Sequence, residues 1–295
     1  MNLNFLVWLL LASIWGSTWL VIRIGLADLP PFTFAGLRFL IAAVPLCAIV
    51  ATRRIPLPRD RSDWVLMLWT GFLVITLNYA LIFWAELYIT SGLSAILYCT
   101  MPLFGQVLAH RRIPAERLTV PRLTGVLLGL AGIGLIFFHE LHVEGTRGML
   151  GCAAVLLASI ATAHSGILVK QKAGHLNPMV LTTVQIVSGI VPLLALGLVV
   201  EGNPFNIHWT TRGVLSLFYL ALMGSSLTFA LLYWLYRRIP VTQTQLIPLF
   251  STLLAVLLGA AVLNEGLSWR TAVGGLAILS GLVVAARAKP RAAVG

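Results

Sequence analysis

The pentapeptide LLASI occupies residues 10–14, and the same five letters return at residues 156–160, about half the chain away. A single match proves little in a chain rich in leucine and alanine, so the flanking sequence has to decide whether it marks a repeat. NYALIFW at 78–84 aligns with TFALLYW at 228–234. The spacing stays between 146 and 150 residues in both cases, which indicates that the chain is built from two homologous halves.

Prolines and glycines extend the repeat. Pro31 corresponds to Pro178 and Pro45 to Pro192, each at an offset of 147 residues. The further matches pair PLF at 102–104 with 248–250, AERL at 115–118 with NEGL at 264–267, and Gly125 and Gly132 with Gly274 and Gly281. Because all of them keep their order, we expect two domains, residues 1–145 and 146–295.

The composition indicates whether the protein is surrounded by water or by lipid. Of the 295 residues, 59% are hydrophobic and only 10% are charged, whereas a soluble domain carries about a quarter charged residues. Long continuous apolar runs also exclude alternating strands. The sequence predicts an all-α membrane protein, with helices long enough to cross about 30 Å of hydrocarbon. The ten predicted spans are 4–24, 31–51, 64–86, 92–109, 122–138, 148–170, 178–200, 213–236, 241–262 and 269–286.

The basic residues predict the orientation. Fifteen of the 20 Lys and Arg lie in loops and a tail on one side of the membrane, four lie on the other side, and Arg38 lies inside the second span. The positive-inside rule places the richer side and both termini in the cytoplasm. This placement explains the net charge of +11 as a topology signal, so we expect the lipid bilayer and no nucleic acid as a partner. The fifteen are Arg53, Arg54, Arg59, Arg61, Arg111, Arg112, Arg117, Arg122, Lys170, Lys172, Arg237, Arg238, Arg287, Lys289 and Arg291.

The odd number of spans in each half determines how the two halves are oriented in the membrane. A half of five spans that begins in the cytoplasm ends outside, so its copy must run through the membrane in the opposite direction. Such inverted repeats place a substrate site near the membrane midplane, where the two halves meet around a central cavity. The sequence therefore predicts a carrier that works by alternating access, and the fused repeat suffices as a monomer.

Four stretches carry a family resemblance: LLASIWGSTWLVIRIGL, PPFTFAGLRFLIAA, LYITSGLSAILYCTMPLF and LNEGLSWRTAVGGLAILSGLVV. The chain resembles the EamA type of the drug/metabolite transporter superfamily over nearly its whole length. The resemblance implies a ten-helix carrier in the bacterial inner membrane that exports small organic metabolites. The YddG-like exporters of aromatic amino acids are one branch to which it is similar. Export of other metabolites or drugs, such as purines and amphipathic compounds, stays open as an alternative.

Polar and aromatic side chains away from the span ends are candidates for substrate contact, because lipid tolerates them poorly. Aromatic rings there suit an aromatic or flat apolar solute. The residues predicted to bind substrate are Trp15, Thr18, Asn78, Tyr79, Tyr98, His164, Ser226 and Gln245. His164 is the one histidine deep in a span; it is either a core histidine bonded within the bundle or a group that contacts substrate and couples transport weakly to protons.

Two prolines at equivalent positions are predicted to act as hinges. Pro102 and Pro248 fall inside the fourth and ninth spans. Each removes one backbone hydrogen bond and releases the carbonyl four residues earlier, on Tyr98 and Thr244. Those carbonyls would suit an ammonium group; a static kink is the alternative.

The sequence also excludes several classes. It contains no nucleophile elbow, zinc-protease motif, phosphate-binding loop or pair of carboxylates at mid-span, so we expect no catalytic residues and no enzyme. Cys47, Cys99 and Cys152 have unrelated spacings, which predicts neither a metal site nor a cofactor. The small multidrug members of the superfamily that the chain resembles use a glutamate in the first helix to export cationic drugs with protons; the first span here contains none, which disfavours that activity. A membrane sensor or scaffold is a remaining alternative, although no soluble output domain is evident.

Overall fold

The computed structural model describes residues 2–85, 88–89, 94, 97–116, 118–136, 145–203, 207, 209–254 and 269–287. Within these residues every regular element is a helix, and no strand occurs. This agrees with the predicted all-α class. Parts of the predicted fourth and ninth spans, residues 92–93, 95–96 and 255–262, lie outside the described residues.

The helices before residue 145 are α1 (Leu3–Leu26), α2 (Pro31–Thr52), α3 (Arg61–Gly71), the π-helix η1 (Phe72–Leu77), α4 (Asn78–Ala85), α6 (Met101–Arg112), the 3-10 turn η2 (Pro114–Glu116) and α7 (Val120–Ile136). Those after it are α8 (Gly145–Lys172), α9 (Pro178–Val200), α10 (Thr211–Ala221), the π-helix η5 (Leu222–Leu227), α11 (Thr228–Tyr236), α12 (Val241–Thr244) and α14 (Trp269–Arg287). Both series contain a helix interrupted by a π-helix of six residues, at an offset of 150 residues.

Six helical stretches of the described residues are long and apolar enough to cross a membrane: Leu3–Leu26, Pro31–Thr52, Arg61–Ala85, Gly145–Lys172, Pro178–Val200 and Thr211–Tyr236. Val120–Ile136 and Ala272–Ala285 are shorter apolar helices. The outer surface is apolar too: Val191 and Val199 on α9 are 73% and 83% exposed. Side chains of this kind on the outside, with polar groups such as Asn78 inside, suit a lipid environment.

Local sequence explains where the helices begin. Pro31 and Pro178 occupy the first turns of α2 and α9, where a missing N–H costs nothing. The side chain of Asn177 accepts a hydrogen bond from the N–H of Met179 and so caps α9. Pro45 and Pro192 lie inside these helices, in agreement with the sequence expectation.

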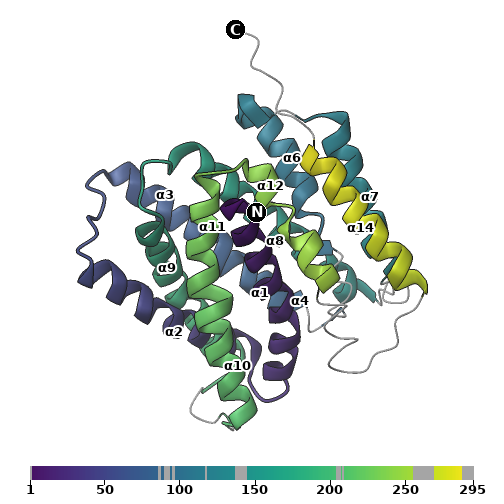
Figure 1. Ribbon diagram of the computed structural model, residues 1–295. Helices are drawn as coiled ribbons and strands as arrows, with labels where there is room; N and C mark the ends of the chain where they lie inside the picture. The colour runs from purple at the N-terminus through teal and green to yellow at the C-terminus, as the bar shows by residue number, and fades with distance from the viewer. Residues whose placement is uncertain are drawn as a thin grey trace.

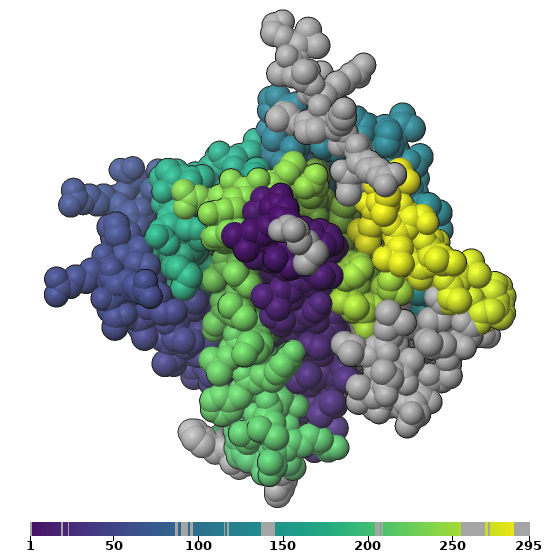
Figure 2. All heavy atoms as spheres, viewed as in Figure 1, coloured from purple at the N-terminus to yellow at the C-terminus, as the bar shows by residue number. Residues whose placement is uncertain are grey.

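The helices pack reciprocally between the two halves of the chain. Helix α2 packs on α9, α10 and η5, while α9 packs on α2, α3 and η1; α1 packs on α10 and α11, while α8 packs on α3 and α4. Figure 1 shows α2, α3 and α9 on one side of the bundle and α6, α7 and α14 on the other. On the face shown in Figure 2, α1 runs beside α10 and α11 of the second half.

Helices α7 and α14 touch backbone to backbone. A Cβ atom added to Gly125 would lie 2.5 Å from the carbonyl oxygen of Gly281, and one added to Gly132 would lie 2.5 Å from that of Gly274. The reverse approaches, from Gly281 to Gly125 and from Gly274 to Gly132, are equally close or closer. Only glycine permits this contact, which is typical of helix pairs in membranes.

Two carboxylates, one in each half of the chain, accept hydrogen bonds from backbone N–H groups at the start of a helix in the other half. Glu116 is 4% exposed and accepts hydrogen bonds from the N–H groups of Val241 and Thr242, each at 3.0 Å. The Thr242 hydroxyl donates to the same carboxylate at 2.7 Å. Glu201 likewise accepts from the N–H groups at the start of α2. A carboxylate is well placed at a helix N-terminus, where backbone donors and the helix dipole favour negative charge.

Candidate functional site

A central cavity of about 120 Å³ lies between the two halves, with room for several water molecules. Its walls come from α1, α2, η1, α4, α8, α11, α12 and the residues around Cys99 and Gln245, whereas α7, α9 and α14 contribute none of the lining residues. The lining residues are Trp15, Thr18, Ile22, Arg38, Val74, Asn78, Tyr79, Ile82, Phe83, Tyr98, Cys99, Met101, Thr162, Ser165, Gly166, Phe229, Leu232, Tyr233, Tyr236, Thr244, Gln245, Pro248, Ser251 and Thr252. Six of the eight predicted binding residues are among them.

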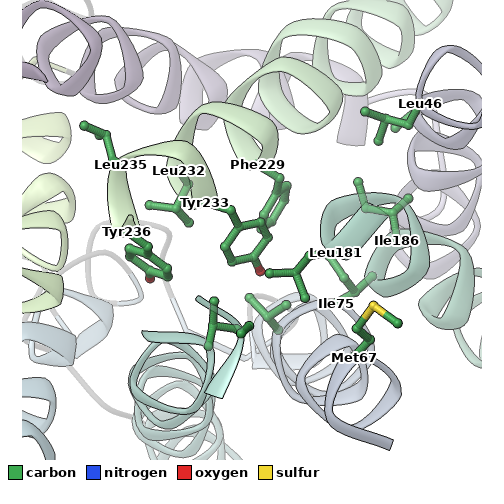
Figure 3. Close-up of a cluster of buried hydrophobic side chains, with 14 of the residues drawn as sticks. Leu46, Met67, Ile75, Leu181, Ile186, Phe229, Leu232, Tyr233, Leu235 and Tyr236 are labelled. Carbon is green, nitrogen blue, oxygen red and sulfur yellow. The ribbon is translucent and has the colours of Figure 1, made fainter. Parts of the chain in front are cut away.

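Aromatic rings form matching walls in the two halves. Helix α4 presents Tyr79 and Phe83, and α11 presents Phe229 and Tyr233, with the same spacing of four residues that places each pair on one helix face. The ring of Trp15 meets Phe229 edge-on at 6.2 Å between centroids. Figure 3 shows Phe229, Tyr233 and Tyr236 projecting from the same helix into the interior. Such rings offer stacking surfaces to a flat or apolar group.

A short chain of hydrogen bonds crosses between the halves on another wall. The Tyr98 hydroxyl donates to Thr162 Oγ1 at 3.4 Å, and the Thr162 hydroxyl donates to Asn78 Oδ1 at 3.1 Å. Asn78 is 4% exposed, so an unpaired amide there would be costly. The chain therefore fixes the amide of α4 against α8.

The segments predicted as the fourth and ninth spans are interrupted beside the cavity. Residues 97–98 are helical, 99–100 form a turn, and α6 begins at Met101; likewise α12 ends at Thr244, 245–246 form a turn, and the helix resumes at 247. Pro102 and Pro248 thus lie in the first turn after each break. Each proline lies at the start of the helical segment after the break, where its missing N–H costs nothing, and its action as a hinge stays a prediction.

Gln245 enters the cavity wall at the second break. It is 2% exposed, and its Nε2 donates to the carbonyl of Ala163 at 3.3 Å, while its Oε1 is buried without a partner among the described residues. A Cβ atom on Gly105 would collide with this side chain. Gly105 therefore leaves the space that Gln245 fills.

Thr18 lines the cavity beside α2 and η5. It is 6% exposed, and its hydroxyl donates to the carbonyl of Trp15 at 2.7 Å. With its proton engaged in the helix, this hydroxyl can still accept a hydrogen bond from a solute.

His164 and Ser226 are not among the lining residues. On α8 the cavity face carries Thr162, Ser165 and Gly166, at spacings of three and four residues, so His164 points elsewhere on the helix. The Ser226 hydroxyl donates to the carbonyls of Ala42 and Ala221 at 2.8 and 3.1 Å and so connects η5 to α2. These two side chains therefore lie outside the cavity wall, unlike the other six predicted residues.

Sequence reasoning missed Arg38, Phe229, Tyr233 and Tyr236 as cavity residues. Two of them, Phe229 and Tyr233, could have been found from the repeat, because Tyr79 aligns with Phe229 and the next ring on the same helix face is four residues further along. Arg38 gave one signal, a charge inside an apolar span. Within the described part of the chain, no group of three or more His, Cys, Asp or Glu could hold a metal ion.

Comparisons with known proteins agree with this architecture. A solved crystal structure matches with a TM-score of 0.81 over 96% of both chains at 18% identity, which shows the fold alone. The "Uncharacterized transporter YoaV" of Bacillus subtilis (strain 168) is 28% identical over 91% of both chains. A "Probable amino-acid metabolite efflux pump" of Escherichia coli (strain K12) is 26% identical over 94% of this chain and 92% of its own length.

The "Uncharacterized inner membrane transporter YedA" of Escherichia coli (strain K12) is 29% identical over 86% of this chain and 81% of its own length. The model of the EamA-like transporter family matches residues 3–138 and again residues 149–287. These two matches together cover most of the chain. The protein therefore belongs to the EamA-like transporter family and is a membrane transporter, not an enzyme.

Proposed function

We propose that the protein exports neutral amino acids, aromatic ones among them, across the bacterial inner membrane by alternating access. The observation that carries the proposal is the cavity, whose aromatic pairs come from both halves and whose polar groups include Asn78, Tyr98 and Gln245. A volume of about 120 Å³ is below the roughly 300–1,000 Å³ of sites for drug-sized ligands. A small metabolite therefore fits the site better than a bulky drug.

The proposed architecture is ten spans in two inverted repeats, residues 1–145 and 146–295. Reciprocal packing supports it: α2 meets η5 as α9 meets η1, and the glycines of α7 and α14 approach each other's carbonyls in both directions. A two-fold axis between the halves produces contacts of this kind. With both termini in the cytoplasm, rocking of one half against the other would open the cavity to each side in turn.

The broken helices support a transport site at the seam. Tyr98 and Cys99 lie at the first break, Thr244 and Gln245 at the second, and all four line the cavity. Cys99 Sγ lies 3.1 Å from Thr252 Oγ1, so the two broken segments touch. Interrupted helices bring backbone dipoles to a solute in many secondary transporters.

The experiment is efflux of labelled amino acids from liposomes containing the purified protein, with and without a pH gradient. Phe229→Ala removes one ring of the wall and should lower the flux of phenylalanine about tenfold, the equivalent of ~1.4 kcal/mol of binding. His164→Ala is the matched control, because its side chain is off the cavity, and should retain flux within about twofold. Equal flux through Phe229→Ala and wild type, or efflux of purines but of no amino acid, would refute the proposal.

The assay also tests the mechanism and the assembly. Flux that is independent of the pH gradient is expected, because no carboxylate from the described residues lines the cavity. A protein that works as a monomer should give the same flux per molecule when it is reconstituted at one copy per vesicle. Acceleration by the gradient would instead indicate coupling to protons.

A further inference from the structure

Arg38 is a buried charge beside the cavity, and none of the described acidic residues provides its counter-charge. It lies on α2, is 2% exposed and lines the cavity. The described acidic residues are Asp28, Asp60, Asp63, Glu116 and Glu201, and none of them pairs with Arg38. A guanidinium inside a membrane bundle is costly unless it is paired.

The described residues accept hydrogen bonds from only part of the Arg38 guanidinium. Its Nε donates to Ser225 Oγ at 2.8 Å, and its Nη2 donates to the carbonyl of Gly224 at 3.0 Å, both in η5. Its Nη1 is buried and has no partner among the described residues. Of the five N–H donors in the guanidinium fork, the two on Nη1 therefore have no acceptor in the described part of the chain, and a carboxylate is an acceptor that suits such donors.

The equivalent position in the second half shows whether helix packing requires a positive charge here. Gln185 lies 147 residues after Arg38, at the same offset as the proline pairs of α2 and α9. It is 1% exposed, and its Nε2 donates to Thr70 Oγ1 at 2.6 Å. A neutral carboxamide therefore connects α9 to α3, as Arg38 connects α2 to η5. The positive charge of Arg38 is not needed for that connection, and Gln185 is not among the cavity residues.

The rings around Arg38 hold the guanidinium in place. Its central carbon lies 5.2 Å from the centroid of Tyr79 and 5.5 Å from that of Phe39, distances at which a cation is attracted to a ring face. Tyr79 belongs to the aromatic wall. An aromatic group stacked on that wall would thus sit next to a fixed positive charge.

We propose that Arg38 is the specificity-determining residue of the cavity and that it binds the carboxylate of the transported solute. This deepens the proposed function, on which it rests, by naming the group that distinguishes a substrate from a related amine. The ammonium group of an amino acid is not required for this contact. The charge selects carboxylates, and the rings select the side chain.

The test measures binding of three probes to the purified full chain: L-phenylalanine, 3-phenylpropionate and phenethylamine. Wild type should bind the two carboxylates at least about tenfold more tightly than the amine, a difference of ~1.4 kcal/mol. Arg38→Gln, which places in the first half the residue of the second, should weaken both carboxylates at least about tenfold and leave the amine within about twofold. Arg38→Lys keeps the charge and loses the fork, so it should weaken them less.

Gln185→Leu is the matched control, because it removes a buried polar group at the equivalent position and should keep the preference for carboxylates. Equal weakening of all three probes in Arg38→Gln, or an unchanged preference, would overturn the assignment. If Arg38→Gln does not fold, equal weakening of all three probes in Arg38→Lys also overturns it. Binding of 3-phenylpropionate through Arg38 without binding of phenylalanine would refute the amino-acid function and leave Arg38 as a carboxylate site. Failure of wild type to bind either carboxylate would overturn the inference.

Discussion

The carboxylate of Glu116 is expected to hold the start of α12, and with it one wall of the cavity. Glu116→Ala would leave the N–H groups of Val241 and Thr242 and the Thr242 hydroxyl without their acceptor. The hydroxyl can rotate to another acceptor, so two buried backbone donors remain, at about 1–3 kcal/mol each. Loss of the favourable charge at a helix start adds about 0.3–1 kcal/mol. We expect the free energy of unfolding to fall by ~4 kcal/mol.

Glu116→Gln should cost about half as much, since its carboxamide keeps one acceptor and turns a donor toward the other N–H group. The measurement is unfolding in mixed detergent micelles, followed by tryptophan fluorescence, with the efflux assay in parallel because α12 carries Thr244 to the cavity. Glu201→Ala is the matched control, since Glu201 caps α2 with two bonds in a less buried position. A loss below about 1 kcal/mol in Glu116→Ala, or one no larger than in the control, would refute the reasoning.

Three further predictions concern other parts of the bundle. The hydrogen bond from Arg212 holds the pKa of the Asp28 carboxyl below its usual range. This pair should therefore stabilise the fold above about pH 4 and lose its effect as pH falls through the lowered pKa. Unfolding midpoints of wild type should exceed those of Asp28→Asn at neutral pH and converge with them in acid. Gly125→Ala should destabilise by ~1–3 kcal/mol through overpacking, whereas Gly134→Ala, with open space around its Cβ position, should unfold like wild type. Tyr98→Phe removes one weak hydrogen bond of the cavity wall and should change phenylalanine efflux less than fivefold, or ~1 kcal/mol.

The sequence determined the membrane environment, the helical class and six of the residues that line the cavity. Apolar runs of about 20 residues with little charge have no stable place in water, and polar or aromatic residues within them have no stable place in lipid. This reasoning is local, so it found Trp15, Asn78 and Tyr98 without knowledge of packing. The repeat was readable for the same reason, because both halves kept similar residues at similar spacings.

Only the tertiary structure decided which way each side chain points and what it bonds. His164 and Thr162 are two residues apart on α8, and the position of neighbouring helices determines that the threonine faces the cavity. The π-helix η5 likewise makes long-range contacts: Ser226 bonds to Ala42, and Arg38 bonds to Ser225. Because the partners in these contacts are more than 180 residues apart, no local pattern could reveal that a charged residue in the second span would end beside the cavity, with its Nη1 unpartnered among the described residues.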